Sequence, residues 1–147
     1  MIFKEDHKDL FSAEDDYYLA HCISADFGMG KGIVVEFNKR FDMKRKLQQK
    51  YPDYLNSWTH FKMKGDCLLE NKVMNLITKE RYYQKPTYKS ITIALEQIKC
   101  ICKINNITKI AMPIIGCGLD KLEWDKVKEI IKNVFEDTNI EILVCIK

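Results

Sequence analysis

Short runs of apolar and β-branched residues recur along the chain and predict buried strands. Four of these runs are strong, at residues 17–23, 73–77, 109–115 and 140–146. Two weaker runs, at residues 2–4 and 67–69, are further strand candidates. Because the strong runs are apolar almost throughout, we expect their strands to be buried on both faces of a sheet.

Between the strand candidates, apolar residues recur at the three- and four-residue spacing of amphipathic helices. One helix is predicted over residues 91–102 and another over residues 127–135. Thr87 is a suitable N-cap for the first of them. A third helix is predicted to begin near Gly32 and to bury four apolar side chains. These are Ile33, Val34, Phe37 and Phe41.

Strands and helices alternate along the chain, and no low-complexity linker or internal repeat separates them. This order is typical of an α/β fold, in which helices cover both faces of a mostly parallel sheet. We therefore predict a three-layer α/β/α sandwich with a mixed, largely parallel central sheet. The 147 residues match one domain of ordinary length, so a single domain over residues 1–147 is expected.

Composition indicates the class of protein but not its partner. Hydrophobic residues make up 46% of the chain and charged residues 31%, which is typical of a soluble globular protein. No segment approaches the roughly 18 apolar residues of a membrane span, and residues 1–10 lack the apolar core of a signal peptide. We expect a cytoplasmic protein, or a nuclear one in a eukaryote, with no membrane partner. The net charge of +3 is compatible with an anionic ligand.

The cysteines indicate neither a zinc site nor a disulfide framework. They lie mostly inside apolar runs and never form a Cys-x-x-Cys pair, so reduced, buried thiols are expected. They are Cys22, Cys67, Cys100, Cys102, Cys117 and Cys145. We predict no metal site and no cofactor, and we expect full activity in the presence of a chelator.

The segment Gly-Cys-Gly-Leu-Asp at residues 116–120 carries the clearest chemistry, because it follows a strong strand run. Ligands of open α/β sheets bind beyond the carboxyl ends of strands, where glycines allow close approach of the backbone. Peptide N–H groups leading into the next helix favour a phosphate or diphosphate. The structural alternative is that Asp120 caps this helix and Glu123 completes a capping box. Cys117 lacks a nearby base, which favours a small loop residue over a nucleophile.

A second glycine cluster, at residues 28–32, also follows a strand run and leads into a predicted helix. It is not a Walker A loop, because Lys31 is followed by glycine, and it is not a dinucleotide fingerprint, because Ile33 occupies the last glycine position. Alone it suits an ordinary turn. Paired with residues 116–120, it predicts a two-sided cradle for a diphosphate and its sugars. His21, inside an apolar strand, is expected to be structural and hydrogen-bonded.

Lys79 follows Thr78 where another strong strand run ends. A lysine at such a position is commonly solvated, and the nearby Arg81 and Lys85 also suit simple phosphate contacts. To attack an electrophilic carbon, Lys79 must be neutral at least transiently, which desolvation between packed loops would favour.

The chain resembles the macrodomain family in three segments. They are LAHCISADFGMGKGI at residues 19–33, LITKERYYQKPTY at residues 76–88 and MPIIGCGLDKLEW at residues 112–124. The resemblance is to the branch that contains terminal ADP-ribose protein glycohydrolase and its prokaryotic and viral relatives, and it extends from about residue 10 to residue 147. The chain lacks the Gly-Asp-Ile adenine clamp and the Asn-Ala-Asn catalytic segment of other macrodomain hydrolases.

This resemblance implies a catalytic pair. Lys79 matches the lysine that attacks the anomeric carbon of the distal ribose and forms a covalent lysyl intermediate. Asp120 matches the acidic residue that acts as general acid and base. The roles make chemical sense, because the lysine divides one difficult displacement into two steps while the carboxylate transfers protons.

The resemblance also implies an ADP-ribose site around the catalytic pair. The backbone of residues 116–119 would hold the diphosphate, and Ser24 with residues 28–32 would contact ribose and diphosphate. Ile114 stands where the resemblance implies an arginine, so one positive charge beside the diphosphate is missing. The implied ligand contacts are Leu10, Ser24, Gly28, Met29, Gly30, Gly32, Thr78, Ile114, Ile115, Gly116, Cys117, Gly118, Leu119 and Lys147.

The sequence therefore predicts a monomeric ADP-ribosylhydrolase that releases ADP-ribose from glutamyl or aspartyl esters in proteins and deacylates O-acetyl-ADP-ribose. Three alternatives stay open: removal of ADP-ribose from a nucleic-acid base, a reader that binds ADP-ribose without turnover, and hydrolysis of ADP-ribose 1″-phosphate. A basic stretch is either a solvated helix face or a surface that steers a nucleic acid. It comprises Lys39, Arg40, Lys44, Arg45 and Lys46.

Overall fold

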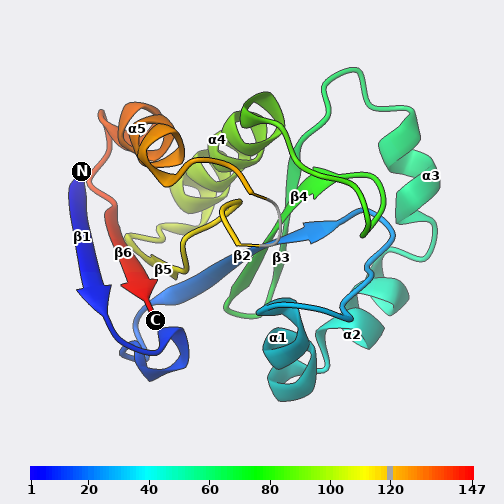
Figure 1. Ribbon diagram of the computed structural model, residues 1–147, viewed down its shortest axis with the longest axis horizontal. Helices are drawn as coiled ribbons and strands as arrows, with labels where there is room; N and C mark the ends of the chain where they lie inside the picture. The colour runs from blue at the N-terminus through cyan, green and yellow to red at the C-terminus, as the bar shows by residue number, and fades with distance from the viewer. Residues whose placement is uncertain (119–120) are drawn as a thin grey trace.

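The computed structural model describes residues 1–118 and 121–147. Within these residues the centre is a six-stranded sheet with the order β1-β6-β5-β2-β4-β3 (Figure 1). The strands are β1 (Ile2–His7), β2 (Tyr18–Ser24), β3 (Asp66–Glu70), β4 (Val73–Lys79), β5 (Lys109–Met112) and β6 (Glu141–Ile146). Neighbouring strands are parallel except for β3, which pairs antiparallel with β4 at one edge.

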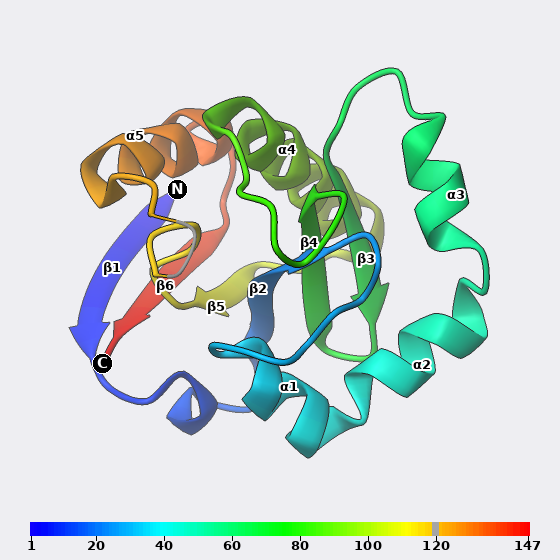
Figure 2. The same ribbon diagram turned by 45° about the vertical axis from the view of Figure 1, so that its right-hand side comes forward.

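Helices cover both faces of this sheet (Figures 1 and 2). They are η1 (Leu10–Ser12), α1 (Val34–Phe41), α2 (Met43–Lys50), α3 (Tyr54–Thr59), α4 (Tyr88–Asn105) and α5 (Trp124–Phe135). One face packs against α4 and α5, and the other packs against η1, α1, α2 and α3. The predicted three-layer α/β/α sandwich with a mixed, largely parallel sheet is confirmed.

Side chains along β6 point alternately to the two faces of the sheet, so this one strand contributes to both hydrophobic cores. Ile142 and Val144 pack into the core under α4 and α5, while Leu143 and Cys145 pack into the core on the other face. Every residue of β4 before Lys79 is buried. The prediction that the strong strand runs are buried on both faces therefore holds for these two strands.

Some predicted boundaries were wrong. The strand expected at residues 109–115 ends at Met112, because Pro113 has no N–H group with which to continue the ladder. The helix expected near Gly32 begins at Val34, and of its four expected core residues only Phe37 is fully buried. The weak candidates at residues 2–4 and 67–69 are confirmed as parts of β1 and β3.

The N-cap prediction at Thr87 is confirmed. The Thr87 hydroxyl oxygen accepts the Ser90 N–H at 3.0 Å, and the Ser90 side chain accepts the Thr87 N–H at 3.0 Å, which forms a capping box. This cap fixes where the segment after β4 turns into α4.

The cysteines form no disulfide within the described part of the chain. The expectation of buried thiols holds for Cys67, Cys102 and Cys145, but it was wrong for the exposed Cys100 and for two half-buried thiols, Cys22 and Cys117. Among the described residues, no helix is long and apolar enough to cross a membrane.

Candidate functional site

The predicted site residues lie at the carboxyl ends of the parallel strands, on one side of the sheet. In chain order they are Leu10 after β1, Ser24 at the end of β2 with the loop to Gly32 that follows, Thr78 and Lys79 in β4, residues 114–118 after β5, and Lys147 after β6. Ligands of open α/β sheets bind at these strand ends. Leu119 and Asp120 lie outside the described residues.

A bulge in the pairing of β2 with β4 sets the position of Lys79. Ile23 lies opposite Ile77, but Ser24 lies opposite Lys79, so Thr78 is the extra residue of the bulge. Such bulges bend a strand and redirect the next side chain. The Thr78 side chain is only 2% exposed, and its hydroxyl oxygen has no hydrogen-bond partner among the residues described here. Buried hydroxyl groups without a partner are uncommon in folded proteins.

The Asp26 carboxylate joins the loop after β2 to the loop after β4. It accepts hydrogen bonds from the Ser24 hydroxyl, from the Gly28 N–H at 3.0 Å and from the Tyr82 N–H at 3.1 Å. Partial burial raises the pKa of Asp26, but these three donors outweigh burial and hold the pKa below its ordinary value. The sequence analysis did not select Asp26, although an aspartate two residues after the end of a strand is a common loop-forming residue.

Close packing between the same two loops requires a glycine at position 28. A β-carbon on Gly28 would lie 2.7 Å from the β-carbon of Tyr82, which is too short for two carbon atoms. Gly30 differs, because a β-carbon there would meet nothing within 4 Å.

The loop after β5 is held in a tight turn by Gly116. Its φ of +73° is left-handed, and its carbonyl oxygen accepts the Leu122 N–H at 2.8 Å. Gly118 is exposed and borders open space. The half-buried Cys117 thiol donates to the Ile115 carbonyl at 3.3 Å. The Gly-Cys-Gly segment thus exposes backbone at Gly118 while Gly116 is anchored.

The capping-box alternative for this segment was wrong for Glu123. Glu123 is itself the N-cap residue of α5 and not the third helical residue, and its side chain makes no capping hydrogen bond. A capping box would require Glu123 inside the first turn.

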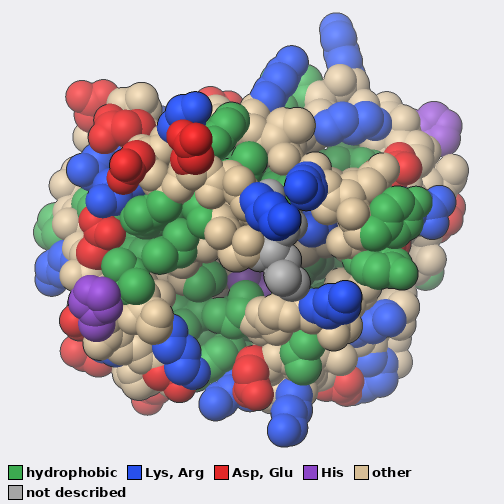
Figure 3. All heavy atoms as spheres, in the orientation of Figure 1, with side chains coloured by type: hydrophobic (Ala, Val, Ile, Leu, Met, Phe, Trp, Pro, Cys, Tyr) green, Lys and Arg blue, Asp and Glu red, His purple; other side chains and the backbone are tan. Residues whose placement is uncertain are grey.

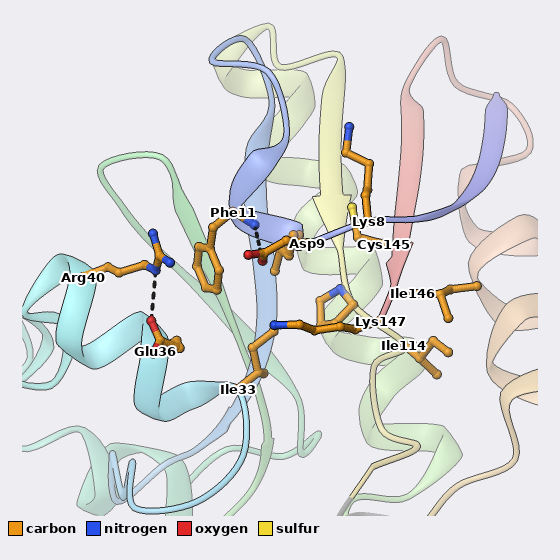
Figure 4. A pocket seen from close by; sticks show the side chains of 12 residues that line it. Lys8, Asp9, Phe11, Ile33, Glu36, Arg40, Ile114, Cys145, Ile146 and Lys147 are labelled. Carbon is orange, nitrogen blue, oxygen red and sulfur yellow. Dashed lines mark hydrogen bonds and ion pairs between the residues drawn. The ribbon is translucent and has the colours of Figure 1, made fainter.

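A cavity of about 490 Å³ lies beside the loop after β5, between α1 and the end of β6. Figure 4 shows Arg40, Glu36 and Ile33 on one side of it, with Ile114, Ile146 and Lys147 on the other. Three predicted contacts, Leu10, Ile114 and Lys147, line this cavity, whereas Lys79 does not. The sequence analysis missed several of its walls. These are Lys8, Asp9, Phe11, Ile33, Glu36, Arg40, Pro113, Cys145 and Ile146.

Arg40 lines the cavity, although its side chain is exposed and belongs to the basic stretch. Its guanidinium lies 4.3 Å from the centre of the Phe11 ring, and its Nε pairs with Glu36 at 3.0 Å. Arg45, from the same basic stretch, pairs with Asp42. These two pairs reduce the positive charge that the stretch offers to a nucleic acid. On the face shown in Figure 3, hydrophobic side chains form a patch with Lys and Arg side chains beside it.

His21 has a structural role. It is fully buried, its Nε2 lies 2.6 Å from Asn75 Oδ1, and its ring stacks on Phe37 with 3.7 Å between ring centres. Burial lowers the pKa of His21 to about 4. The expectation of a hydrogen-bonded histidine is confirmed.

Comparison with known proteins shows the family of the chain. The Macro domain model matches residues 25–131. The chain belongs to the macrodomain family. The macrodomain is 43% identical over 140 residues to the ADP-ribose glycohydrolase OARD1 of Homo sapiens, covering 92% of this chain and 86% of the relative. The protein of the same name from Bos taurus matches equally well.

Solved structures share this macrodomain fold at low identity. The macrodomain of Thermus aquaticus DarG has a TM-score of 0.79 and 19% identity, covering 98% of this chain and 97% of that one. Thermosipho africanus DarTG, solved in complex with ADP-ribose, has a TM-score of 0.75 and 20% identity, covering 99% of this chain and 42% of that one.

In the described part of the macrodomain, no group of three or more His, Cys, Asp or Glu side chains could hold a metal ion. The polar groups at the carboxyl ends of the strands are instead a lysine, hydroxyl groups and backbone N–H groups, which suit a phosphorylated sugar.

Proposed function

We propose that this macrodomain binds ADP-ribose and hydrolyses mono-ADP-ribosyl esters, with Lys79 as the nucleophile and Asp120 as the general acid and base. The observation that carries the proposal is the position of Lys79 at the carboxyl end of β4, directly opposite Ser24 at the end of β2. The relative named ADP-ribose glycohydrolase, 43% identical over most of both chains, supports an enzyme over a reader.

The ligand would extend along the carboxyl ends of the strands. The cavity lined by Leu10, Ile114 and Lys147 is large enough, at about 490 Å³, for the adenosine end. The diphosphate would follow over the backbone at Gly118, and the distal ribose would reach Lys79.

In the proposed reaction, the neutral Lys79 amine attacks the anomeric carbon of the distal ribose. The bond from that carbon to the ester oxygen breaks, and the acceptor leaves as a carboxylate while the nitrogen loses a proton to a base. Water then cleaves the covalent carbon–nitrogen bond, which releases ADP-ribose and regenerates the amine. Asp120 would take and return these protons, a role that rests on the sequence resemblance. O-acetyl-ADP-ribose that carries its acetyl group on the 1″ oxygen would react at the same carbon, with acetate as the leaving group.

The test is release of ADP-ribose from a protein that carries mono-ADP-ribose on glutamate. Wild type is compared with Lys79→Ala and with Lys103→Ala, which removes an exposed lysine from the far end of α4. Release by wild type and Lys103→Ala, but not by Lys79→Ala, supports the proposal. If none releases ADP-ribose while all three bind it, the protein acts as a reader on this substrate.

A second candidate substrate is ADP-ribosylated single-stranded nucleic acid, and one observation favours it. Tyr82 and Tyr83 follow Lys79 closely, are 64% and 70% exposed, and lie edge to face with 5.4 Å between ring centres. Exposed Arg81 and Lys85 flank them. Exposed rings that stack on bases, beside cations that contact phosphates, are typical of single-strand binding.

This candidate is tested with ADP-ribosylated single-stranded DNA as substrate. The Tyr82→Ala/Tyr83→Ala double variant should lose activity on DNA and keep its activity on the protein ester, and binding of the DNA should weaken steeply with salt. Equal losses on both substrates, or a flat salt response, would remove this candidate.

A further inference from the structure

We propose that Asp26 is a positioning residue, whose carboxylate fixes the loop after β2 to the segment after β4 and so sets the direction in which Lys79 projects. The inference rests on the proposed function, because it assigns a catalytic use to the orientation of Lys79.

The contacts of Asp26 span two loops that are far apart in sequence. One carboxylate oxygen, Oδ1, accepts the hydroxyl of Ser24, the last residue of β2, and the N–H of Gly28 in the loop after β2. The other oxygen, Oδ2, accepts the Tyr82 N–H at 3.1 Å, from the segment after β4. The Asp26 side chain therefore links the two loops by hydrogen bonds.

Two backbone hydrogen bonds beside Asp26 continue the pairing of β2 and β4 past the bulge. The Ala25 N–H donates to the Lys79 carbonyl at 2.8 Å, and the Asp26 N–H donates to the Glu80 carbonyl at 3.1 Å. Lys79 thus lies between the bulge at Thr78 on one side and the Asp26 contacts on the other. Both of its backbone flanks are therefore fixed by contacts with the end of β2 and the loop that follows it.

Only a carboxylate satisfies all of these partners. The three groups that face Asp26 are donors, and a carboxylate offers acceptors on both oxygens, whereas an asparagine offers them on one. The lowered pKa of Asp26 agrees with a charged acceptor surrounded by donors. The Ser24 hydroxyl donates its only hydrogen to Asp26, so its oxygen can act toward a ligand only as an acceptor. An acceptor suits a ribose hydroxyl group and does not suit a phosphate oxygen.

Packing supports the same role. Because Gly28 has no side chain, Tyr82 can pack closely against the loop after β2. A β-carbon on residue 28 would lie only 2.7 Å from the Tyr82 β-carbon. The Tyr82 N–H can reach Asp26 only because the two segments are this close.

The experiment measures kcat and KM for release of ADP-ribose from the glutamyl ester by Asp26→Ala and Asp26→Asn. Because small displacements of a reacting group are costly, kcat should fall by about 10- to 100-fold in Asp26→Ala and less in Asp26→Asn, with KM changed by less than about threefold. Two variants serve as controls. Ile98→Val trims the fully buried core under α4, and Asp16→Asn removes a carboxylate that bonds Lys109 at 2.8 Å near the opposite end of β2.

Both controls should keep kcat within about twofold of wild type. If kcat of the Asp26 variants falls only in proportion to a loss of thermal stability, as judged against Ile98→Val, the proposal is overturned. It is also overturned if the whole loss appears in KM.

Amide hydrogen exchange provides a readout that does not depend on activity. In wild type, the Gly28 and Tyr82 amides should exchange slowly, and in Asp26→Ala they should exchange at least about tenfold faster, together with neighbouring amides up to Tyr83. Unchanged exchange shows that the contacts do not hold the loops, and it overturns the proposal even if wild type releases no ADP-ribose. Faster exchange with an unchanged kcat overturns the positioning role. No turnover by wild type, with faster exchange in the variant, contradicts the proposed function and leaves Asp26 as a loop clamp without a catalytic use.

Discussion

The N–H group of Ala25 donates a hydrogen bond of 2.8 Å to the carbonyl oxygen of Lys79, so the backbone of the proposed nucleophile is part of the sheet. Replacing the side chain leaves this bond intact. We therefore expect Lys79→Ala to fold normally, with a melting temperature within about 2 °C of wild type and unchanged affinity for ADP-ribose, while turnover falls at least about 100-fold. Differential scanning fluorimetry, calorimetric titration and the release assay check these three expectations together. A variant that retains turnover would remove Lys79 from the chemistry.

Two glycines of the loop after β5 should respond differently to substitution. In Gly116→Ala the new β-carbon would lie 2.6 Å from Ile91 Cδ1 and the left-handed φ of +73° would be strained, so stability should fall by about 1–3 kcal/mol. Gly118→Ala meets open space, and its stability should stay within about 0.5 kcal/mol of wild type. Urea unfolding measures both. The ADP-ribose affinity of Gly118→Ala should nevertheless fall if the diphosphate approaches that backbone, and unchanged affinity would contradict this placement.

Acid should destabilise the macrodomain through His21. Burial lowers the pKa of His21 from 6.5 to about 4 in the folded protein, so between these values the unfolded chain binds the extra proton. The free energy of unfolding therefore keeps its full value above pH 6.5. It decreases as the pH falls toward 4, by about 3 kcal/mol in total. Unfolding free energies measured across this range should show a shallower slope for His21→Asn than for wild type. His60→Asn, which changes an exposed histidine, should keep the wild-type slope, and a loss of slope in that variant would assign the effect elsewhere.

Position 114 should tune affinity for ADP-ribose. Ile114 lines the cavity together with Lys147, and an arginine there would add a cation beside the proposed diphosphate position. Ile114→Arg should bind ADP-ribose about three- to tenfold more tightly at low salt, with a smaller gain at high salt. Isothermal titration at two salt concentrations measures this. Ile114→Gln is the matched control, and an equal gain in that variant would show that charge is not the cause.

The fold was predictable wherever burial dictated the pattern. Residues 73–77 and 140–146 are apolar because both faces of their strands are covered, so the sequence alone located them. By contrast, α2 has the sequence MKRKLQQK, in which only Met43 and Leu47 are buried, and such a polar segment resembles a solvated loop. α3 is six residues long and follows Pro52, too short for periodicity to be recognised.

Backbone features near the candidate site were predictable where a glycine or a strand end marks them, because Gly116 has a positive φ and Lys79 ends β4. The site was not predictable where a side chain acts across a long sequence distance. Asp26 bonds Tyr82, 56 residues away, and nothing in either segment alone indicates this contact. Arg40 is exposed, as a solvated helix face predicts, but nothing in its basic neighbours indicates that its guanidinium lies over the Phe11 ring in the cavity wall.

The pairing of the first strand with the last one has a consequence for how the chain is made. β1 is an outer strand of the sheet and pairs with β6. Ile2 therefore cannot form its strand pairing until Glu141, the residue opposite it, has been synthesised. During translation the first strand therefore leaves the ribosome long before its partner exists. The half of the sheet built from β2, β3 and β4 can assemble earlier, because its strands are closer in sequence and its loops cost less entropy to close. Ribosome-bound chains that end before β6 should accordingly protect the amides of β4 while those of β1 still exchange.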